Sequence, residues 1–128
     1  MGYYSDVSLC LSKTGVNRLK ERLGNSAPEV KSEVERLLEY ADSHTLDASS
    51  EAEFWWWSDI KWYSDFPDVG FMEAFMRELD EKDYYFLRIG EADDDTERLG
   101  CYLDNPFNMY LVRSIHFSGP EEIAYGNR

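Results

Sequence analysis

The segment from Glu53 to Tyr63 constrains the fold most, because it alternates like a β-strand and holds all four tryptophans of the chain. Successive strand residues point to opposite faces of a sheet, so the segment divides into two sets of side chains. We expect the set of Phe54, Trp56, Ile60 and Trp62 to face the core. The other set is Glu53, Trp55, Trp57, Asp59, Lys61 and Tyr63. If a helix covers this second face, both faces are core; if it is open, Trp55, Trp57 and Tyr63 form an aromatic interface beside Asp59.

Hydrophobic periodicity predicts the other elements of the fold. Alternation predicts further strands over residues 3–12, 84–89, 97–102 and 109–117. Helical spacing predicts helices over residues 16–23, 28–41 and 69–79, with a loop or irregular edge over residues 42–51. Ser26-Ala27-Pro28-Glu29 has the form of a capping box at the start of the second helix. The order β-α-α-β-α-β-β-β predicts one α+β domain over residues 1–128, with about three helices on one face of a mostly antiparallel sheet.

The net charge of the chain is confined to its middle. From Asp42 to Asp104 there are 18 acidic and 5 basic residues, a balance of −13, and the segments on either side are each neutral. Acids interleaved with aromatic residues resemble nucleic-acid phosphate to a basic partner, and they repel nucleic acid itself. The composition therefore predicts a basic protein surface as partner and argues against direct binding of nucleic acid.

The densest acidic stretch lies in a predicted turn after the strand at residues 84–89. Its acidic residues are Glu91, Asp93, Asp94, Asp95 and Glu97. One interpretation is a solvated hairpin loop. A calcium site is a second interpretation, although the EF-hand spacing is absent. In the third, the turn mimics phosphates as part of a negative ridge with Glu73, Glu78, Asp80, Glu81 and Asp83.

No motif in the chain indicates catalysis, a cofactor or a metal as strongly as the charge distribution indicates a basic partner. Asp59-Ile60-Lys61, with Asp47 or Glu53 upstream, has the form of a nuclease site, but such a site also needs basic surface to hold phosphate. Neither Cys10 nor Cys101 belongs to a CxxC pair, so both are interpreted as reduced thiols. We expect no catalytic residue, no cofactor and no metal ligand.

Several short stretches resemble small proteins carried by bacteriophages and prophages. They are Gly2–Val7, Lys61–Tyr63, Tyr84–Glu91 and Asp95–Gly100. The resemblance covers about half of the chain and supplies no catalytic residues. It implies a bacterial cytoplasmic setting, in which small acidic phage proteins include anti-CRISPR and anti-restriction inhibitors of host defence.

The expected function is that of a non-enzymatic binding protein, with its acidic and aromatic middle on the basic, nucleic-acid-binding surface of a partner. One alternative is a structural or regulatory protein that forms a homo-oligomer through the Trp55, Trp57 and Tyr63 face. A further alternative is a metal-dependent hydrolase. We expect a cytoplasmic protein without a membrane segment.

Overall fold

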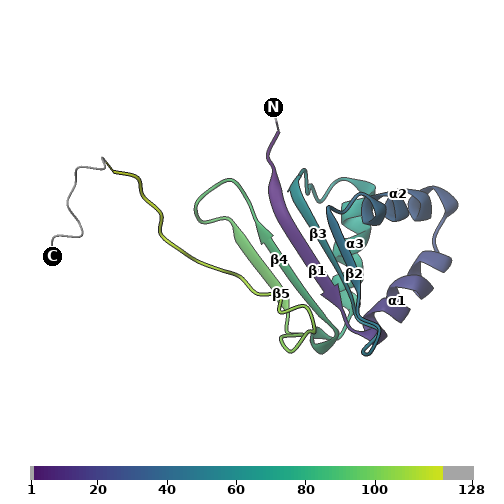
Figure 1. Ribbon diagram of the computed structural model, residues 1–128. Helices are drawn as coiled ribbons and strands as arrows, with labels where there is room; N and C mark the ends of the chain where they lie inside the picture. The colour runs from purple at the N-terminus through teal and green to yellow at the C-terminus, as the bar shows by residue number, and fades with distance from the viewer. Residues whose placement is uncertain (1, 120–128) are drawn as a thin grey trace.

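The sheet contains five antiparallel strands in the order β2-β3-β1-β4-β5, as the computed structural model shows for residues 2–119 (Figure 1). The strands are β1 (Ser5–Leu11), β2 (Ser43–Leu46), β3 (Glu53–Ile60), β4 (Tyr84–Ile89) and β5 (Thr96–Gly100). β1 is central and pairs with both β3 and β4. β2 forms one edge, in the stretch where the sequence predicts a loop or an irregular edge, and β5 forms the other. The predicted α+β class is confirmed.

Three helices form a layer on one face of the sheet (Figure 1). They are α1 (Lys13–Gly24), α2 (Pro28–Glu39) and α3 (Pro67–Glu78), and a single 3₁₀ turn, η1 (Glu81–Asp83), leads into β4. The side chain of Ser12 caps α1 by accepting a hydrogen bond from the Gly15 amide at 3.2 Å. Proline begins both α2 and α3, where its missing amide proton removes no helical hydrogen bond.

The predicted capping box of α2 is absent. Ala27 is the N-cap residue and makes no side-chain bond. The Ser26 hydroxyl instead donates to the backbone oxygen of Arg22 at 2.7 Å, near the end of α1. Ser26 thus hydrogen-bonds to a backbone carbonyl at the end of α1 rather than to a backbone amide at the start of α2.

The main core lies between the sheet and the helix layer. Strands β1 and β4 contribute alternate residues to this core: Val7, Leu9 and Leu11 from β1, and Tyr84 and Phe86 from β4. They pack with apolar residues of all three helices, which are Val16, Leu19, Leu23, Val34, Leu37, Val69, Met72, Phe75 and Met76. The helices therefore bury one face of the sheet, as predicted.

Over residues 54–57 the two faces of the tryptophan strand are reversed relative to the expected arrangement, whereas Ile60 and Trp62 contact the main core, as expected. Trp55 and Trp57 lie under the helices and are 3% and 1% exposed, whereas Trp56, expected in the core, is 39% exposed. The indole Nε1 of Trp57 donates to the backbone oxygen of Leu37 at 2.9 Å, which ties β3 to α2. An open interface through Trp55 and Trp57 is therefore excluded.

The strand also ends earlier than the alternation predicts. Asp59 has a φ of 53°, a left-handed conformation that interrupts the pleat, and β3 ends at Ile60. Beyond this point Trp62 turns into the main core, where its ring centroid lies 5.6 Å from that of Trp57. Tyr63 is half-buried, and its hydroxyl accepts a hydrogen bond from the Tyr3 amide at 2.7 Å.

The opposite face of the sheet is covered only in part, by the segment that follows β5. Met109 packs there with Cys10, Tyr85 and Leu87, and the Phe107 ring lies 5.5 Å from that of Phe54. The buried side chain of Asn105 holds the turn through hydrogen bonds to backbone atoms of Tyr102, Phe107 and Met109. The strand predicted over residues 109–117 is absent. Met109 and Leu111 pack on the open face of the sheet, and the chain beyond them extends away on the β5 side (Figure 1).

Candidate functional site

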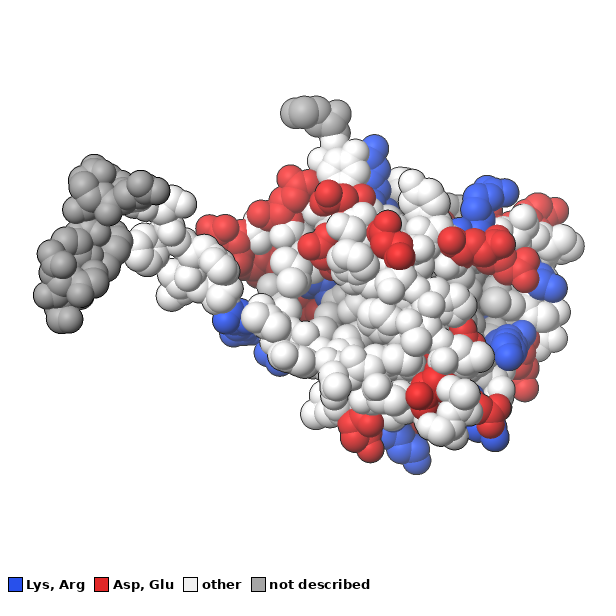
Figure 2. Space-filling view, in the orientation of Figure 1, with Lys and Arg blue, Asp and Glu red and all other residues white. Residues whose placement is uncertain are grey.

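Acidic side chains gather at one end of the sheet. β1 and β5 begin at this end, and β3 and β4 finish there, because all strand pairs are antiparallel. The acidic residues brought together are Asp6, Asp42, Asp59, Glu91, Asp93, Asp94, Asp95 and Glu97, and we call this region the acidic end. Figure 2 shows acidic residues along the edge of the molecule where the β4–β5 turn lies, beside an uncharged central face.

Three of these carboxylates accept hydrogen bonds from backbone amides at the irregular ends of the strands. Asp42 Oδ2 accepts from the Ser58 amide at 2.7 Å, and Asp6 Oδ1 accepts from the Asp59 amide at 3.1 Å. Glu91 Oε2 accepts from the Tyr4 amide at 2.5 Å. The register of β1 against β3 shifts between Ser5 and Val7, which interrupts the ladder at this point. These acids therefore have a structural role as well as a negative charge.

Arg88 neutralises the inner part of the acidic turn. Its guanidinium donates to Asp95 Oδ1 at 2.6 Å, to Glu97 Oε1 at 3.0 Å and to the Ser5 hydroxyl at 3.1 Å. The bond from Arg88, followed by one from the Tyr3 hydroxyl, lowers the pKa of Asp95 to about 2. A Cβ at position 90 would overlap the ends of the Asp95 and Tyr3 side chains, so a larger residue there would displace them. Asp95 and Glu97 are therefore anchors of the turn.

Asp93 and Asp94 are the acids of the turn that remain available to a partner. Both are exposed, and neither side chain has a hydrogen bond or ion pair within the described residues. The turn itself is held by backbone bonds, such as the one from the Gly90 amide to the Asp95 oxygen at 2.8 Å. Two free carboxylates thus project from a turn that other residues fix in place.

An apolar groove of about 350 Å³ adjoins the acidic end on the open face of the sheet. Its floor includes Trp56, Leu87 and Ile89, and part of its wall is the segment from Phe107 to Val112. Asp6 also lines the groove, directly opposite Ile89 in the β1–β4 pairing. With Trp56 39% exposed and Ile89 42% exposed, the groove offers aromatic and aliphatic surface beside negative charge.

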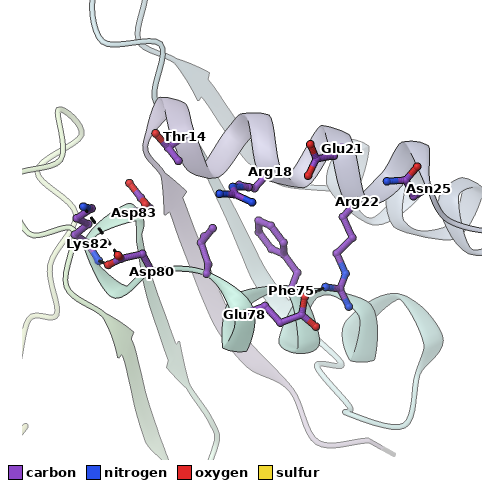
Figure 3. Close-up of a pocket in the computed structure, with 11 residues that line it drawn as sticks. Thr14, Arg18, Glu21, Arg22, Asn25, Phe75, Glu78, Asp80, Lys82 and Asp83 are labelled. Carbon is purple, nitrogen blue, oxygen red and sulfur yellow. Dashed lines mark hydrogen bonds and ion pairs between the residues drawn. The ribbon is translucent and has the colours of Figure 1, made fainter.

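A larger cleft of about 630 Å³ lies between α1 and the segment from α3 to η1 (Figure 3). It contains two of the predicted partner-binding acids, and both are paired: Glu78 with Arg22, and Asp80 with Lys82 at 4.0 Å. Figure 3 shows Phe75 between the two helices at the floor of this cleft. The cleft therefore presents opposite charges that largely cancel.

The predicted negative ridge is interrupted. Glu78 and Asp80 precede β4, whereas the acidic turn follows it, and a strand of this length separates its two ends by about 17 Å. Glu73 lies on α3 within the helix layer. The acids of the turn and those of α3 and η1 thus belong to two separate surfaces.

The nuclease-like residues are not brought together either. Glu53 and Asp59 lie at opposite ends of β3, about 20 Å apart along the strand. Glu53 bonds to His44 at 2.6 Å, and Asp47 accepts bonds from Ser49 and Ser50. Within residues 2–119, no three His, Cys, Asp or Glu side chains are grouped so as to hold a metal ion. The helices of this part of the chain are also too short and too polar to cross a bilayer.

The two cysteines differ in environment, which predicts different reactivity. Burial raises the pKa of the Cys10 thiol to about 12, whereas Cys101 is exposed after β5. Since the thiolate is the reactive form, we expect a maleimide to modify Cys101 alone in the folded protein and both thiols after denaturation. Mass spectrometry of intact protein and its peptides measures this. Labelling of Cys10 at the rate of Cys101 under native conditions would contradict the buried position.

Neither the role of Arg88 nor the open groove was predicted from the sequence. Arg88 is the one basic residue between Asp83 and Arg98, next to five acids, and this position could have identified it as their partner. The groove depends on which sheet face the helices cover, which alternation does not determine. No protein-family model, no curated protein and no solved structure matches the chain.

Proposed function

We propose that this chain is a non-enzymatic binding protein whose acidic end and adjoining groove occupy a basic surface of a partner protein. The partner class is a nucleic-acid-binding protein, because carboxylates can take the places that phosphates occupy on such a surface. The setting we propose is a bacterial cell in which the chain inhibits host defence, as expected of a small acidic phage protein.

The observation that supports this proposal most is the free pair of carboxylates on a fixed turn. Asp93 and Asp94 need no rearrangement to meet cationic side chains, since Arg88 and backbone bonds already hold the turn. Ordering a flexible loop on binding would lower affinity, and this turn avoids that loss. Charge at the rim of an interface mainly accelerates association, so affinity should fall as salt is raised.

Trp56 supplies the apolar anchor of the same surface. Tryptophan is enriched among the residues that dominate binding energy, and an exposed indole can also stack against a guanidinium. Trp56 lies opposite Ser8 in the β1–β3 pairing, in the middle of the open face. A partner that covers the groove while contacting Asp93 and Asp94 would combine apolar burial with charge pairing.

The proposal predicts that removing two free charges from the turn weakens binding. The test captures proteins from bacterial lysate on the tagged chain, identifies them, and measures their affinity for the purified protein. We expect Asp93→Asn with Asp94→Asn to weaken binding at least tenfold, because each lost contact to a charged group contributes on the order of 1 kcal/mol. Double-stranded DNA at constant ionic strength should displace the same partner.

The matched control removes two exposed acids at the other end of the sheet, Glu81→Gln with Asp104→Asn. Neither side chain has a bond within the described residues, so the net charge changes equally while the acidic end stays intact. Equal loss of affinity in both double variants would show that only total charge matters. A partner that DNA does not displace would rule out nucleic-acid mimicry.

A further inference from the structure

The groove on the open face of the sheet is lined by a single charged side chain, that of Asp6. Asp6 Oδ1 accepts a hydrogen bond from the Asp59 amide at 3.1 Å. The other oxygen of this carboxylate has no hydrogen bond or ion pair within residues 2–119. The groove therefore combines apolar walls with one carboxylate oxygen that is available to a ligand.

The hollow arises from residues that face one another across three strands. Ser8 of β1 lies opposite Trp56 of β3 on one side and opposite Leu87 of β4 on the other. Because serine is small and both neighbours are large, the surface is lowest above β1. The Ser8 hydroxyl donates to the Met109 sulfur at 3.2 Å, which fixes one wall. With a volume of about 350 Å³, the groove can hold one long side chain but not a helix.

Trp56 and Asp6 lie close enough to contact the same cationic group. Asp6 precedes Ser8 by two residues on the same face of β1, and such diagonal neighbours on adjacent strands have Cα atoms about 7–8 Å apart. Trp56 is 39% exposed, and among the described residues its ring contacts no other aromatic ring and no cation. An open indole face thus lies next to an available carboxylate oxygen.

Charge selects a cation as the occupant of this groove. The acidic end adjoins it, and Arg88 lies on the helix-covered face opposite Val7, where Asp95 and Glu97 pair with it. Two other arginines lie beside the groove: Arg98 is opposite Leu87, and Arg113 follows Val112. Neither of them lines it. The structure therefore leaves the Asp6 carboxylate without a cationic partner from the described part of the chain.

We propose that this groove binds one arginine side chain of the basic partner protein. The methylene stem would lie against Leu87 and Ile89, the guanidinium plane against the Trp56 indole, and a guanidinium N–H would donate to Asp6. Arginine fits better than lysine, because a planar guanidinium can stack on a ring and donate in its own plane at the same time. A lysine ammonium is a compact and strongly hydrated charge. This inference rests on the proposed function and narrows it to one residue type of the partner.

The test titrates the full chain with a hexa-arginine peptide and with hexalysine at constant ionic strength, by calorimetry. We expect hexa-arginine to bind about fivefold more tightly or better, the size of a partly desolvated contact between a cation and an aromatic ring. Trp56→Leu should remove this preference for arginine. Asp6→Asn should weaken hexa-arginine binding without unfolding, because the amide oxygen of asparagine can still accept from the Asp59 amide.

The matched controls lie outside the groove. Asp93→Asn removes the same charge from the acidic turn, and Tyr40→Leu removes an aromatic ring that is 75% exposed next to α2. Both should keep the preference for arginine. The indole N–H signal of Trp56 in nuclear magnetic resonance spectra, assigned by its loss in Trp56→Leu, should shift with hexa-arginine. In the peptide-free protein neither Arg98→Met nor Arg113→Met should move this signal.

Equal affinity for the two peptides would overturn the inference, and so would a preference for arginine that Trp56→Leu and Asp6→Asn leave intact. A Trp56 signal that moves in peptide-free Arg98→Met or Arg113→Met would mean that the chain's own arginine fills the groove, which also overturns it. These results do not decide the proposed function, which depends on the Asp93 and Asp94 variant and on displacement of the lysate partner by DNA. The two proposals can therefore fail separately.

Discussion

Replacing Trp57 with alanine should lower the free energy of unfolding by roughly 3–5 kcal/mol, the range for truncating a large buried aromatic residue. The side chain is 1% exposed and lies between β3 and the helix layer, with Trp62 5.6 Å away between ring centroids. Truncation would leave a cavity that the strand and helices cannot close. It would also remove one of the hydrogen bonds to the backbone oxygen of Leu37, which also accepts from the Tyr40 amide at 3.2 Å. Urea denaturation followed by circular dichroism measures the loss.

The neighbouring residue provides the control, because it has the same chemistry on the other face of the strand. Trp56→Ala removes a side chain that is 39% exposed, so we expect a loss of about 1–2 kcal/mol. This variant should instead impair partner binding through the groove. Equal losses of stability in the two variants would contradict the burial of Trp57 under the helices. So would a Trp57→Ala variant that keeps its stability but loses a partner.

The tryptophan strand also shows which parts of the fold alternation can predict. It separates Trp55 and Trp57 from Trp56 correctly, because backbone geometry sends successive side chains to opposite faces. It does not determine which face the helices cover, since both sets contain large aromatic residues and that choice depends on how the connections pack. The pattern also fails beyond Asp59, where a left-handed φ of 53° ends the regular pleat.

The sequence predicts which acidic residues belong to the candidate site, but it does not predict which of them form ion pairs. The acids of the turn from Glu91 to Glu97 are evident in the sequence, but the division into anchors and free charges depends on strand register. Arg88 lies opposite Glu97 in the β4–β5 ladder, and this places its guanidinium between Glu97 and Asp95. The strand predicted over residues 109–117 is absent for a different reason. Its residues alternate, but a strand also needs a neighbouring strand to pair with, and alternation does not supply one.

Replacing Arg88 with methionine should destabilise the fold by about 2 kcal/mol. Removing one partner of a fully buried ion pair costs roughly 3–5 kcal/mol, because the remaining charge is left without compensation. Here the side chains of Asp95 and Glu97 are 29% and 38% exposed, so water screens them and the loss is smaller. Thermal and urea unfolding at neutral pH measure the effect. Arg98→Met, on the adjacent strand, is the control, since Arg98 is exposed and has no ion pair among the described residues.

The pH dependence of stability separates the loss of this ion pair from a general loss of packing. The pKa of Asp95 is lowered to about 2 in the folded protein, whereas an unfolded aspartate has a pKa near 3.9. The unfolded state therefore takes up the proton first, and the stabilisation is complete above about pH 4 and disappears as the pH falls towards 2. The difference in stability between the native chain and Arg88→Met should narrow over that interval. If the difference stays constant down to pH 2, the Arg88–Asp95 pair is not what stabilises the turn.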